Sequence, residues 1–168
     1  EKIKIILNNL FSENEENLIS IYQNGLANGS YRKFYHNNFE NNPLEFLTLI
    51  SSEIIHGNLD DNLNYEKKLE IFSKRKLIMN CGASTSFVSN ILNFHNIKSR
   101  IVSTIVVENK NTYDDGHILL EIFVKDYNKW ILIDFTHNVI FADKDNNYLS
   151  LFELNESDFD NVNIINLS

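Results

Sequence analysis

The sequence has very little cysteine, proline and glycine, and these low counts exclude several classes of protein. It has one cysteine, one proline and five glycines among 168 residues. A single cysteine excludes an internal disulfide and a zinc site built from several cysteines. With 43% apolar residues and so little proline and glycine, collagen-like and wholly disordered chains are also excluded.

Positive charge is scarce as well, because 15 lysines and arginines face 23 aspartates and glutamates. The formal charge of −8 repels phosphate backbones and anionic lipid, so we expect neither nucleic acid nor a membrane as a partner. No apolar run approaches the roughly 20 residues that a membrane-spanning helix requires. No secretory signal is visible, so we expect a cytoplasmic protein; a signal peptide already removed before Glu1 would leave no trace.

What the sequence does contain is a change of pattern along its length. Apolar residues at helical spacing predict helices over 3–10, 43–57, 66–76 and 81–94, with a polar loop over 31–42. Pro43 suits the first turn of the second of these helices. From residue 100 onward, β-branched and aromatic residues predict antiparallel strands over 101–107, 117–124, 130–135 and 139–141. A last helix is expected within 149–159, with Ser150 as its N-cap. The sequence therefore predicts a single α+β domain over 1–168.

Cys81 stands where the helix over 81–94 is expected to begin. Free backbone N–H groups and the positive end of the helix dipole favour a thiolate at such a position. Gly82 allows a substrate carbonyl to approach the backbone, and the Cys81 N–H can donate to a developing oxyanion. The alternative interpretation of the same cysteine is a small buried hydrophobic residue.

A nucleophilic cysteine needs a base, and the base needs a third group that fixes its tautomer. His117 opens the strand over 117–124, so its imidazole can face the start of the helix. Asp134 lies at the far end of the next strand and can accept the second ring N–H. Cys81, His117 and Asp134 are therefore the candidate catalytic residues. His137 lies near Asp134 too, but the spacing favours His117.

The sequence around these positions resembles the core of the transglutaminase-like cysteine enzymes, a branch of the papain-like architecture. The resemblance covers residues 80–138, in the stretches NCGASTSFVSNILNFHNIKSRIV, GHILLEIFV and KWILIDFTHN. In that family an Arg follows the helix-opening Cys after 19 residues. A His with a Glu four residues on comes next, and then a Trp with an Asp four residues on. The matching residues here are Cys81 and Arg100, His117 and Glu121, and Trp130 and Asp134.

Four departures from the family pattern stand close to these residues. Phe135 replaces the proline that usually follows the Asp, and Met79–Asn80 stand where a glycine often precedes the Cys. His95–Asn96 replace a Leu-Gly pair near the end of the helix, and Lys98 replaces a usual proline. None of these changes removes a catalytic group.

The resemblance implies a papain/transglutaminase-like core, with N-terminal helices packed on an antiparallel sheet and the nucleophile at a helix N-terminus. It implies acyl transfer from amide or peptide carbonyls through a thioester, ending in hydrolysis, deamidation or transamidation. For a small acidic domain of bacterial style it favours hydrolysis. The expected partners are a peptide, a protein or a small amide, and neither a cofactor nor a metal is expected. The second oxyanion donor is open among Gln23, Tyr31 and His56.

Two other functions remain open at this point. One is a non-catalytic module on the same fold that binds a peptide or glycan. The other is an acyl transferase similar to the arylamine acetyltransferases, which use the same three residue types.

The remaining motif residues have structural interpretations. We expect Arg100 to form an ion pair at the start of its strand and Glu121 to lie on an outward strand face. Trp130 is expected to be a core residue that anchors the hairpin. The run 143–147 suggests a calcium loop, but Tyr148 and Leu154 occupy the positions where an EF-hand needs Gly and Glu.

Overall fold

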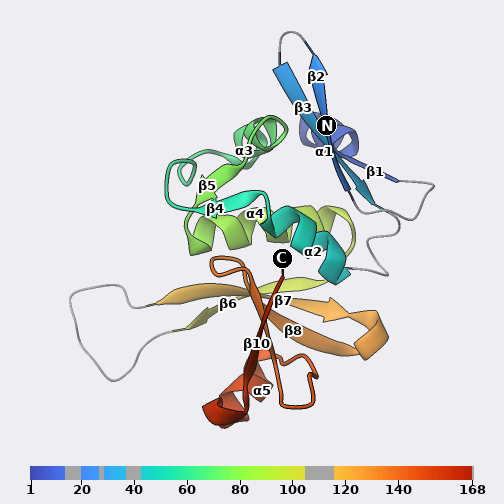
Figure 1. The fold of residues 1–168 in the computed structure, drawn as a ribbon. Coiled ribbons are helices and arrows are strands. Elements are labelled where there is room, and N and C mark those ends of the chain that lie inside the picture. The colour runs from blue at the N-terminus through green and yellow to red at the C-terminus, as the bar shows by residue number, and fades with distance from the viewer. Residues whose placement is uncertain (14–19, 27–28, 37–42, 105–115, 168) are drawn as a thin grey trace. The chain divides into compact units, whose positions relative to one another are not determined.

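The computed structural model describes residues 1–13, 20–26, 29–36, 43–104 and 116–167, and it has a mixed α+β fold (Figure 1). The chain divides into two compact units, Glu1–Asn80 and Cys81–Ser168. No helix within the described ranges is long and apolar enough to cross a membrane. Since the division falls directly before Cys81, all three candidate catalytic residues belong to the second unit.

In its described ranges, the first unit combines three helices with two small sheets. Its strands β1, β3 and β2 form one sheet in that order, and β4 pairs in parallel with β5. Its elements are α1 (Lys2–Leu10), β1 (Phe11–Glu13), β2 (Ser20–Leu26), β3 (Gly29–His36), α2 (Pro43–Ser51), β4 (Ile54–His56), α3 (Tyr65–Phe72) and β5 (Leu77–Met79).

Aromatic rings form much of the core of this unit. The Phe34 and Phe72 rings stack with their centroids 4.9 Å apart, and Phe11 packs against Phe34 at 5.2 Å. Phe34, Phe46 and Phe72 are fully buried. Because these residues come from β3, α2 and α3, the rings join elements that are distant in the sequence.

Three predictions for the first 80 residues are wrong. The helix expected over 66–76 ends at Phe72, and residues 77–79 form β5. Part of the loop expected over 31–42 is strand β3, which pairs with β2; residues 37–42 lie outside the described ranges. The helix that begins at Pro43 ends at Ser51 instead of Gly57, because the next residues form β4 and pair with β5. The close approach of the two strands explains Gly57, where a Cβ atom would lie 2.4 Å from Ile78 Cγ2.

Asp60 is a buried carboxylate that closes the loop between β4 and α3. It accepts hydrogen bonds from both terminal nitrogens of Arg75 at 2.8 Å and from the Ile78 N–H at 2.9 Å. The bonds from Arg75 lower the pKa of Asp60, and this effect exceeds the opposing effect of burial. The carboxylate therefore stays ionised and ties the loop to β5 and to Arg75, in the segment between α3 and β5.

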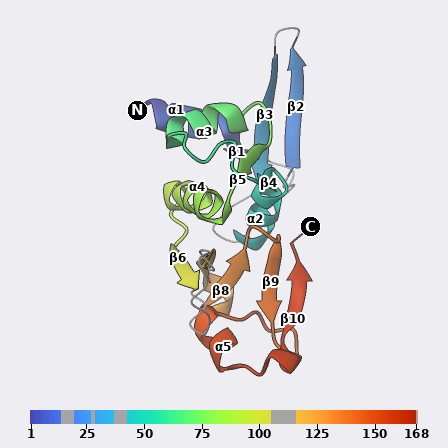
Figure 2. The same ribbon diagram turned by 90° about the vertical axis from the view of Figure 1, so that its left-hand side faces the viewer.

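Within the described residues, the second unit is a five-stranded antiparallel sheet with one long helix and one short helix. The strand order is β10-β9-β8-β7-β6, and every neighbouring pair is antiparallel. Figure 2 shows β8, β9 and β10 side by side. Its main elements are α4 (Cys81–Phe94), β6 (Ser99–Thr104), β7 (His117–Val124), β8 (Lys129–Asp134), β9 (Val139–Ala142), α5 (Leu151–Glu156) and β10 (Asn163–Asn166). Two short 3-10 turns, Lys125–Tyr127 and Phe159–Asn161, complete it.

These elements confirm the α+β class and most of the expected strands. The predicted strand over 117–124 is β7, and Ser150 caps α5 through a capping box with Glu153. Residues 105–107 of the first predicted strand lie outside the described ranges, and β10 was not predicted. The helix α4 packs on β6 and β7, and its expected apolar face is buried, namely Phe87, Val88, Ile91 and Leu92.

Asn96 explains how α4 ends without the glycine of the family pattern. Its φ of 58° lies in the left-handed region, where asparagine is tolerated better than most side chains. The Ile97 N–H reaches back to the Leu92 carbonyl at 3.0 Å. Asn96 therefore supplies the conformation that a C-terminal glycine normally supplies.

Glu121 joins three elements of the second unit through one buried carboxylate. It lies opposite Arg100 in the β6–β7 register and forms an ion pair with it, as predicted for Arg100. Its other oxygen accepts the Leu151 N–H at 2.8 Å, at the start of α5. The expectation that Glu121 lies on an outward face is wrong: its side chain is fully buried, where Arg100 and the first N–H of α5 satisfy its two oxygens.

Trp130 completes this arrangement. The Arg100 guanidinium lies 4.3 Å from the centroid of the indole ring. The Phe123 ring, directly opposite on β7, meets the indole at 5.6 Å in an edge-on arrangement. The contact across the β7–β8 hairpin agrees with the prediction of a hairpin anchor, but Trp130 is half-buried and is not one of the buried core residues.

Replacing Glu121 with alanine should lower the free energy of unfolding by about 1–3 kcal/mol, because the α5 N–H and Arg100 lose their buried acceptor. Urea denaturation followed by circular dichroism measures the change. Glu156→Ala, at an exposed position of α5, is the control and should stay within about 0.5 kcal/mol of the unaltered protein. A loss no larger than that of the control would contradict the role of Glu121.

His95 makes the stability of the fold depend on pH. Burial lowers its pKa to about 4, so the folded state binds fewer protons than the unfolded state between about pH 4 and about pH 6.5. The stability due to neutral His95 is therefore complete above this range and is lost as the pH falls through it. His95→Leu should remove about 1–2 kcal/mol of this pH dependence, allowing for partial exposure of the ring. Urea midpoints at several pH values test this, and His56→Leu, at an exposed histidine, should keep the full dependence.

Candidate active site

Cys81 is the first residue of α4, which runs for 14 residues. The first N–H groups of an α-helix have no acceptor within the helix. These N–H groups and the positive end of the helix dipole therefore lie at the end of α4 where Cys81 stands. The cysteine is partly buried, and its carbonyl accepts a hydrogen bond from the Ser84 hydroxyl at 3.0 Å. The prediction that Cys81 opens a helix is confirmed.

His117 and Asp134 lie together because they stand at adjoining ends of paired strands. His117 begins β7 and Asp134 ends β8, and the two strands are antiparallel. The His117 Nε2 atom lies 2.9 Å from Asp134 Oδ2. The exposed fraction of the His117 side chain is 28% and that of Asp134 is 7%. A nearly buried carboxylate therefore holds an imidazole that solvent still reaches, as predicted for this pair.

The other oxygen of Asp134 is held by the backbone of the turn that follows β8. Oδ1 accepts the N–H groups of Thr136 and His137, at 2.8 and 3.1 Å. This turn keeps the carboxylate in place although Phe135 stands where the family has proline. With Oδ1 fixed, Oδ2 is left to face side chains.

His137 is the site residue whose contact the sequence reasoning underestimated. Its Nδ1 atom lies 2.7 Å from the same Asp134 Oδ2 that His117 contacts. The spacing favoured His117 over His137 as the partner of Asp134, but in the structure both imidazoles contact Asp134 Oδ2. The feature of the sequence that indicates this contact is the three-residue separation of His137 from Asp134, which lets the imidazole reach the carboxylate across a tight turn.

The protonation of Asp134 follows from these contacts. Burial alone would raise its pKa, but hydrogen bonds from His137 and His117, with the His137 backbone N–H, outweigh burial and lower the pKa below its usual value. Asp134 is therefore a carboxylate at neutral pH, which is the form that can orient a neutral imidazole or stabilise an imidazolium.

The start of α4 lies beside the start of β7. Thr85, one turn after Cys81, places its hydroxyl 3.5 Å from the carbonyl of Ile118, the residue next to His117. Among the described residues, no hydrogen bond joins Cys81 Sγ to His117. Because Nε2 of His117 faces Asp134, Nδ1 is the nitrogen left for another group. A contact of about 3–4 Å between that nitrogen and Cys81 Sγ stays a prediction.

The three candidates for the second oxyanion donor belong to the first unit. Gln23 lies in β2, Tyr31 in β3 and His56 at the end of β4, where it is exposed. The side chains of Gln23 and Tyr31 are outside the described part of the structure. The role of these residues stays a prediction, as does that of the Cys81 backbone N–H.

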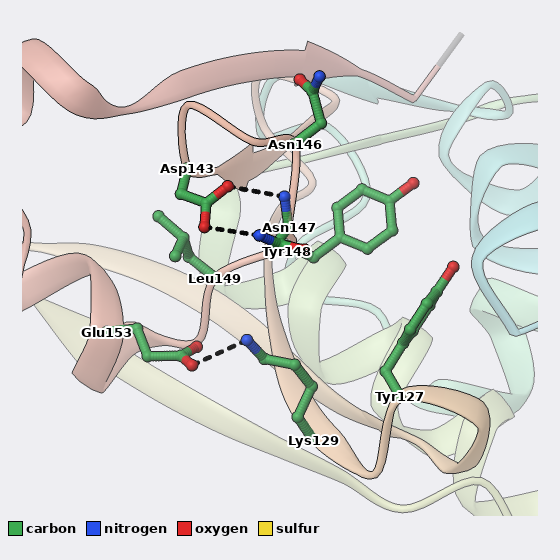
Figure 3. A pocket seen from close by; sticks show the side chains of 8 residues that line it. All are labelled: Tyr127, Lys129, Asp143, Asn146, Asn147, Tyr148, Leu149 and Glu153. Atoms are coloured by element: carbon green, nitrogen blue, oxygen red, sulfur yellow. Dashed lines mark hydrogen bonds and ion pairs between the residues drawn. The ribbon is translucent and has the colours of Figure 1, made fainter.

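A cavity of about 540 Å³ lies elsewhere in the second unit (Figure 3). The Tyr127 and Tyr148 rings meet edge-on at 5.8 Å, and Lys129 pairs with Glu153 at 2.8 Å. Asp143 accepts hydrogen bonds from both the backbone and the side-chain nitrogen of Asn147. The lining residues are Tyr127, Lys129, Asp143, Asn146, Asn147, Tyr148, Leu149 and Glu153. The carboxylate of Asp143 thus shapes the turn over 143–147.

No protein-family model matches the sequence, and comparison with curated proteins and with solved structures gives no match either. The case for a function therefore rests on the motif spacings and on the geometry of Cys81, His117 and Asp134.

Asp134→Asn should make the protein less sensitive to acid. Because the folded-state pKa of Asp134 is lowered, its contribution to stability is complete above about pH 4 and is lost as the pH falls through the folded value. Asparagine can still accept the two backbone N–H groups, but it does not attract protonated imidazoles. We expect a loss of about 1–2 kcal/mol at pH 7 and a flatter decline below pH 4 in urea denaturation. Asp126→Asn, at an exposed carboxylate, should decline as the unaltered protein does.

Proposed function

We propose that the protein is a cysteine-dependent acyl-transfer enzyme of the transglutaminase-like type, acting on amide or peptide carbonyls. Cys81 is the nucleophile, His117 the general base and acid, and Asp134 the residue that positions His117. The proposal includes a papain/transglutaminase-like core within a single domain over 1–168. It also includes a cytoplasmic setting, which keeps the only thiol reduced.

The observation that carries the proposal is the 2.9 Å contact between His117 Nε2 and Asp134 Oδ2. A carboxylate that holds one imidazole nitrogen leaves the other nitrogen free to exchange a proton with a nucleophile. Cys81 begins the helix that packs on the strand of His117, which supports this pairing. The lowered pKa of Asp134 gives it the charge needed to stabilise the imidazolium.

The reaction has two halves. The Cys81 thiolate attacks the carbonyl carbon to form a C–S bond, and the Cys81 backbone N–H donates to the resulting oxyanion. The His117 imidazolium gives its proton to the amine as the C–N bond breaks, and a thioester remains. His117 then takes a proton from the acceptor, which attacks the thioester and releases the Cys81 thiolate.

The acceptor decides the product. Water gives hydrolysis or deamidation, whereas a primary amine gives transamidation. We favour water, following the expectation for a small acidic domain. The product masses from a peptide amide, incubated with and without a primary amine, distinguish the two outcomes, with Cys81→Ala as the inactive control.

Alkylation of Cys81 tests the proposal without a known substrate, because Cys81 is the only thiol. In buffer containing EDTA at pH 6.5, iodoacetamide should modify it faster than free cysteine. His117→Ala should slow the reaction by about tenfold or more, since the imidazolium that stabilises the thiolate is absent. Asp134→Asn should slow it less, because Asp134 acts through His117. Asp126→Asn is the control and should leave the rate unchanged.

Two results would contradict this assignment. If His137→Ala slows alkylation as much as His117→Ala, His117 is not the particular partner of the thiol. If Cys81 reacts only after denaturation, it is a buried structural residue, and a non-catalytic module that binds a peptide or glycan becomes the better interpretation.

A further inference from the structure

Two imidazole nitrogens converge on one carboxylate oxygen in the second unit. His117 Nε2 and His137 Nδ1 lie 2.9 and 2.7 Å from Asp134 Oδ2, and all three atoms are within 4.8 Å of one another. Acyl transfer uses only one of these imidazoles. The second, whose side chain is 68% exposed, has no part in that reaction.

Hydrogen bonds from the backbone hold the Asp134 carboxylate, in the way that outer-shell hydrogen bonds hold the ligands of a metal ion. The N–H groups of Thr136 and His137 fix Asp134 Oδ1, so Oδ2 is available as a single, directed oxygen ligand. His117 is fixed in turn by its place at the start of β7. Two of the three groups are therefore oriented before any ion binds.

We propose that His117 Nε2, Asp134 Oδ2 and His137 Nδ1 form a Zn²⁺ site with its fourth position open to solvent. Two imidazoles and one carboxylate are a donor set that suits zinc, whereas calcium and magnesium prefer oxygen ligands alone. This differs from the expectation from the sequence, which included no metal.

The two distances from Asp134 Oδ2 are near those that this ion requires, and the two nitrogens, within 4.8 Å of each other, have to reach the same ligand separation. A tetrahedral zinc with bonds of about 2.0–2.1 Å holds its ligand atoms about 3.3 Å apart. Each nitrogen therefore has to move away from Oδ2 by only about half an ångström from its hydrogen-bonded position. The exposed imidazole of His137 provides the way in from solvent and can make this adjustment.

Zinc at this site also has a consequence for Cys81, which rests on the proposed function. When the metal takes Nε2 of His117, the proton of the neutral ring resides on Nδ1. That nitrogen can then no longer accept a proton from a thiol or an acceptor. Bound zinc should therefore slow the reaction of Cys81 reversibly, and EDTA should restore it.

The site is tested first in a Cys81→Ser background, which removes the thiol as a competing ligand. Calorimetric titration with Zn²⁺ should give one site per chain. His137→Ala or Asp134→Asn should weaken binding by at least about tenfold, since even the loss of an outer-shell partner costs a metal site about 10–100-fold. His56→Ala removes an exposed histidine of the first unit and should bind zinc as tightly as the Cys81→Ser protein.

Imidazole ¹⁵N resonances provide a second measurement. Zinc should shift His117 Nε2 and His137 Nδ1, and leave the nitrogens of His56 in place. The absence of saturable binding, full affinity in the His137→Ala variant, or shifts confined to other histidines would overturn the site.

Alkylation of the protein with its thiol intact separates this inference from the proposed function. Zinc should slow alkylation by iodoacetamide, and His137→Ala should abolish most of that effect. If zinc slows alkylation of the unaltered protein and of His137→Ala equally, zinc acts at the thiol and the inhibition through His117 is wrong.

If the Cys81→Ser protein binds zinc but His117→Ala leaves alkylation unchanged, the metal site stands and the proposed function fails. If the titration fails while His117→Ala slows alkylation, the proposed function stands and the metal site fails.

Discussion

The arrangement of the site depends on the two oxygens of one buried carboxylate. Asp134 gives Oδ1 to the backbone of the turn after β8, and this fixes the direction in which Oδ2 points. Oδ2 then meets His117 and His137. Because burial would otherwise favour the protonated acid, these hydrogen bonds are what keep Asp134 charged. Without that charge, the structure would contain two histidines near a turn and nothing to orient them.

A second buried carboxylate supports the sheet that carries the first. Glu121 links Arg100 on β6 to the start of α5, while Arg100 lies over the ring of Trp130. Residues four apart on a strand lie on the same face, so His117 and Glu121 share a face of β7, as Trp130 and Asp134 do of β8. The spacings that resemble the transglutaminase-like pattern thus join a site residue to a structural residue on each strand.

The proposed acyl transfer and the proposed zinc binding would use the same atoms. Asp134 orients the imidazole of His117, and its Oδ2 is also the oxygen on which His117 and the exposed His137 converge as possible metal ligands. The two proposed roles of His117 exclude each other, since Nε2 cannot hold a metal while the ring cycles a proton through Nδ1. The reactivity of the thiol therefore tests both proposals, and Cys81→Ser separates them.

Features set by neighbouring residues could be predicted from the sequence. The period of apolar residues predicted α4, alternation and β-branching predicted β7 and β8, and Pro43 and Ser150 predicted two helix starts. The pairing of His117 with Asp134 also followed, because a hairpin brings adjoining strand ends together. Features set by distant residues could not be predicted. Residues 54–56 are a strand because β5 pairs with them, and buried Glu121 has its partners on β6 and at the start of α5. The contact of two histidines with Asp134 could not be predicted either. It depends on the orientation of the imidazole rings, which decides which nitrogens reach Oδ2, and the spacing of residues in the sequence does not fix that orientation.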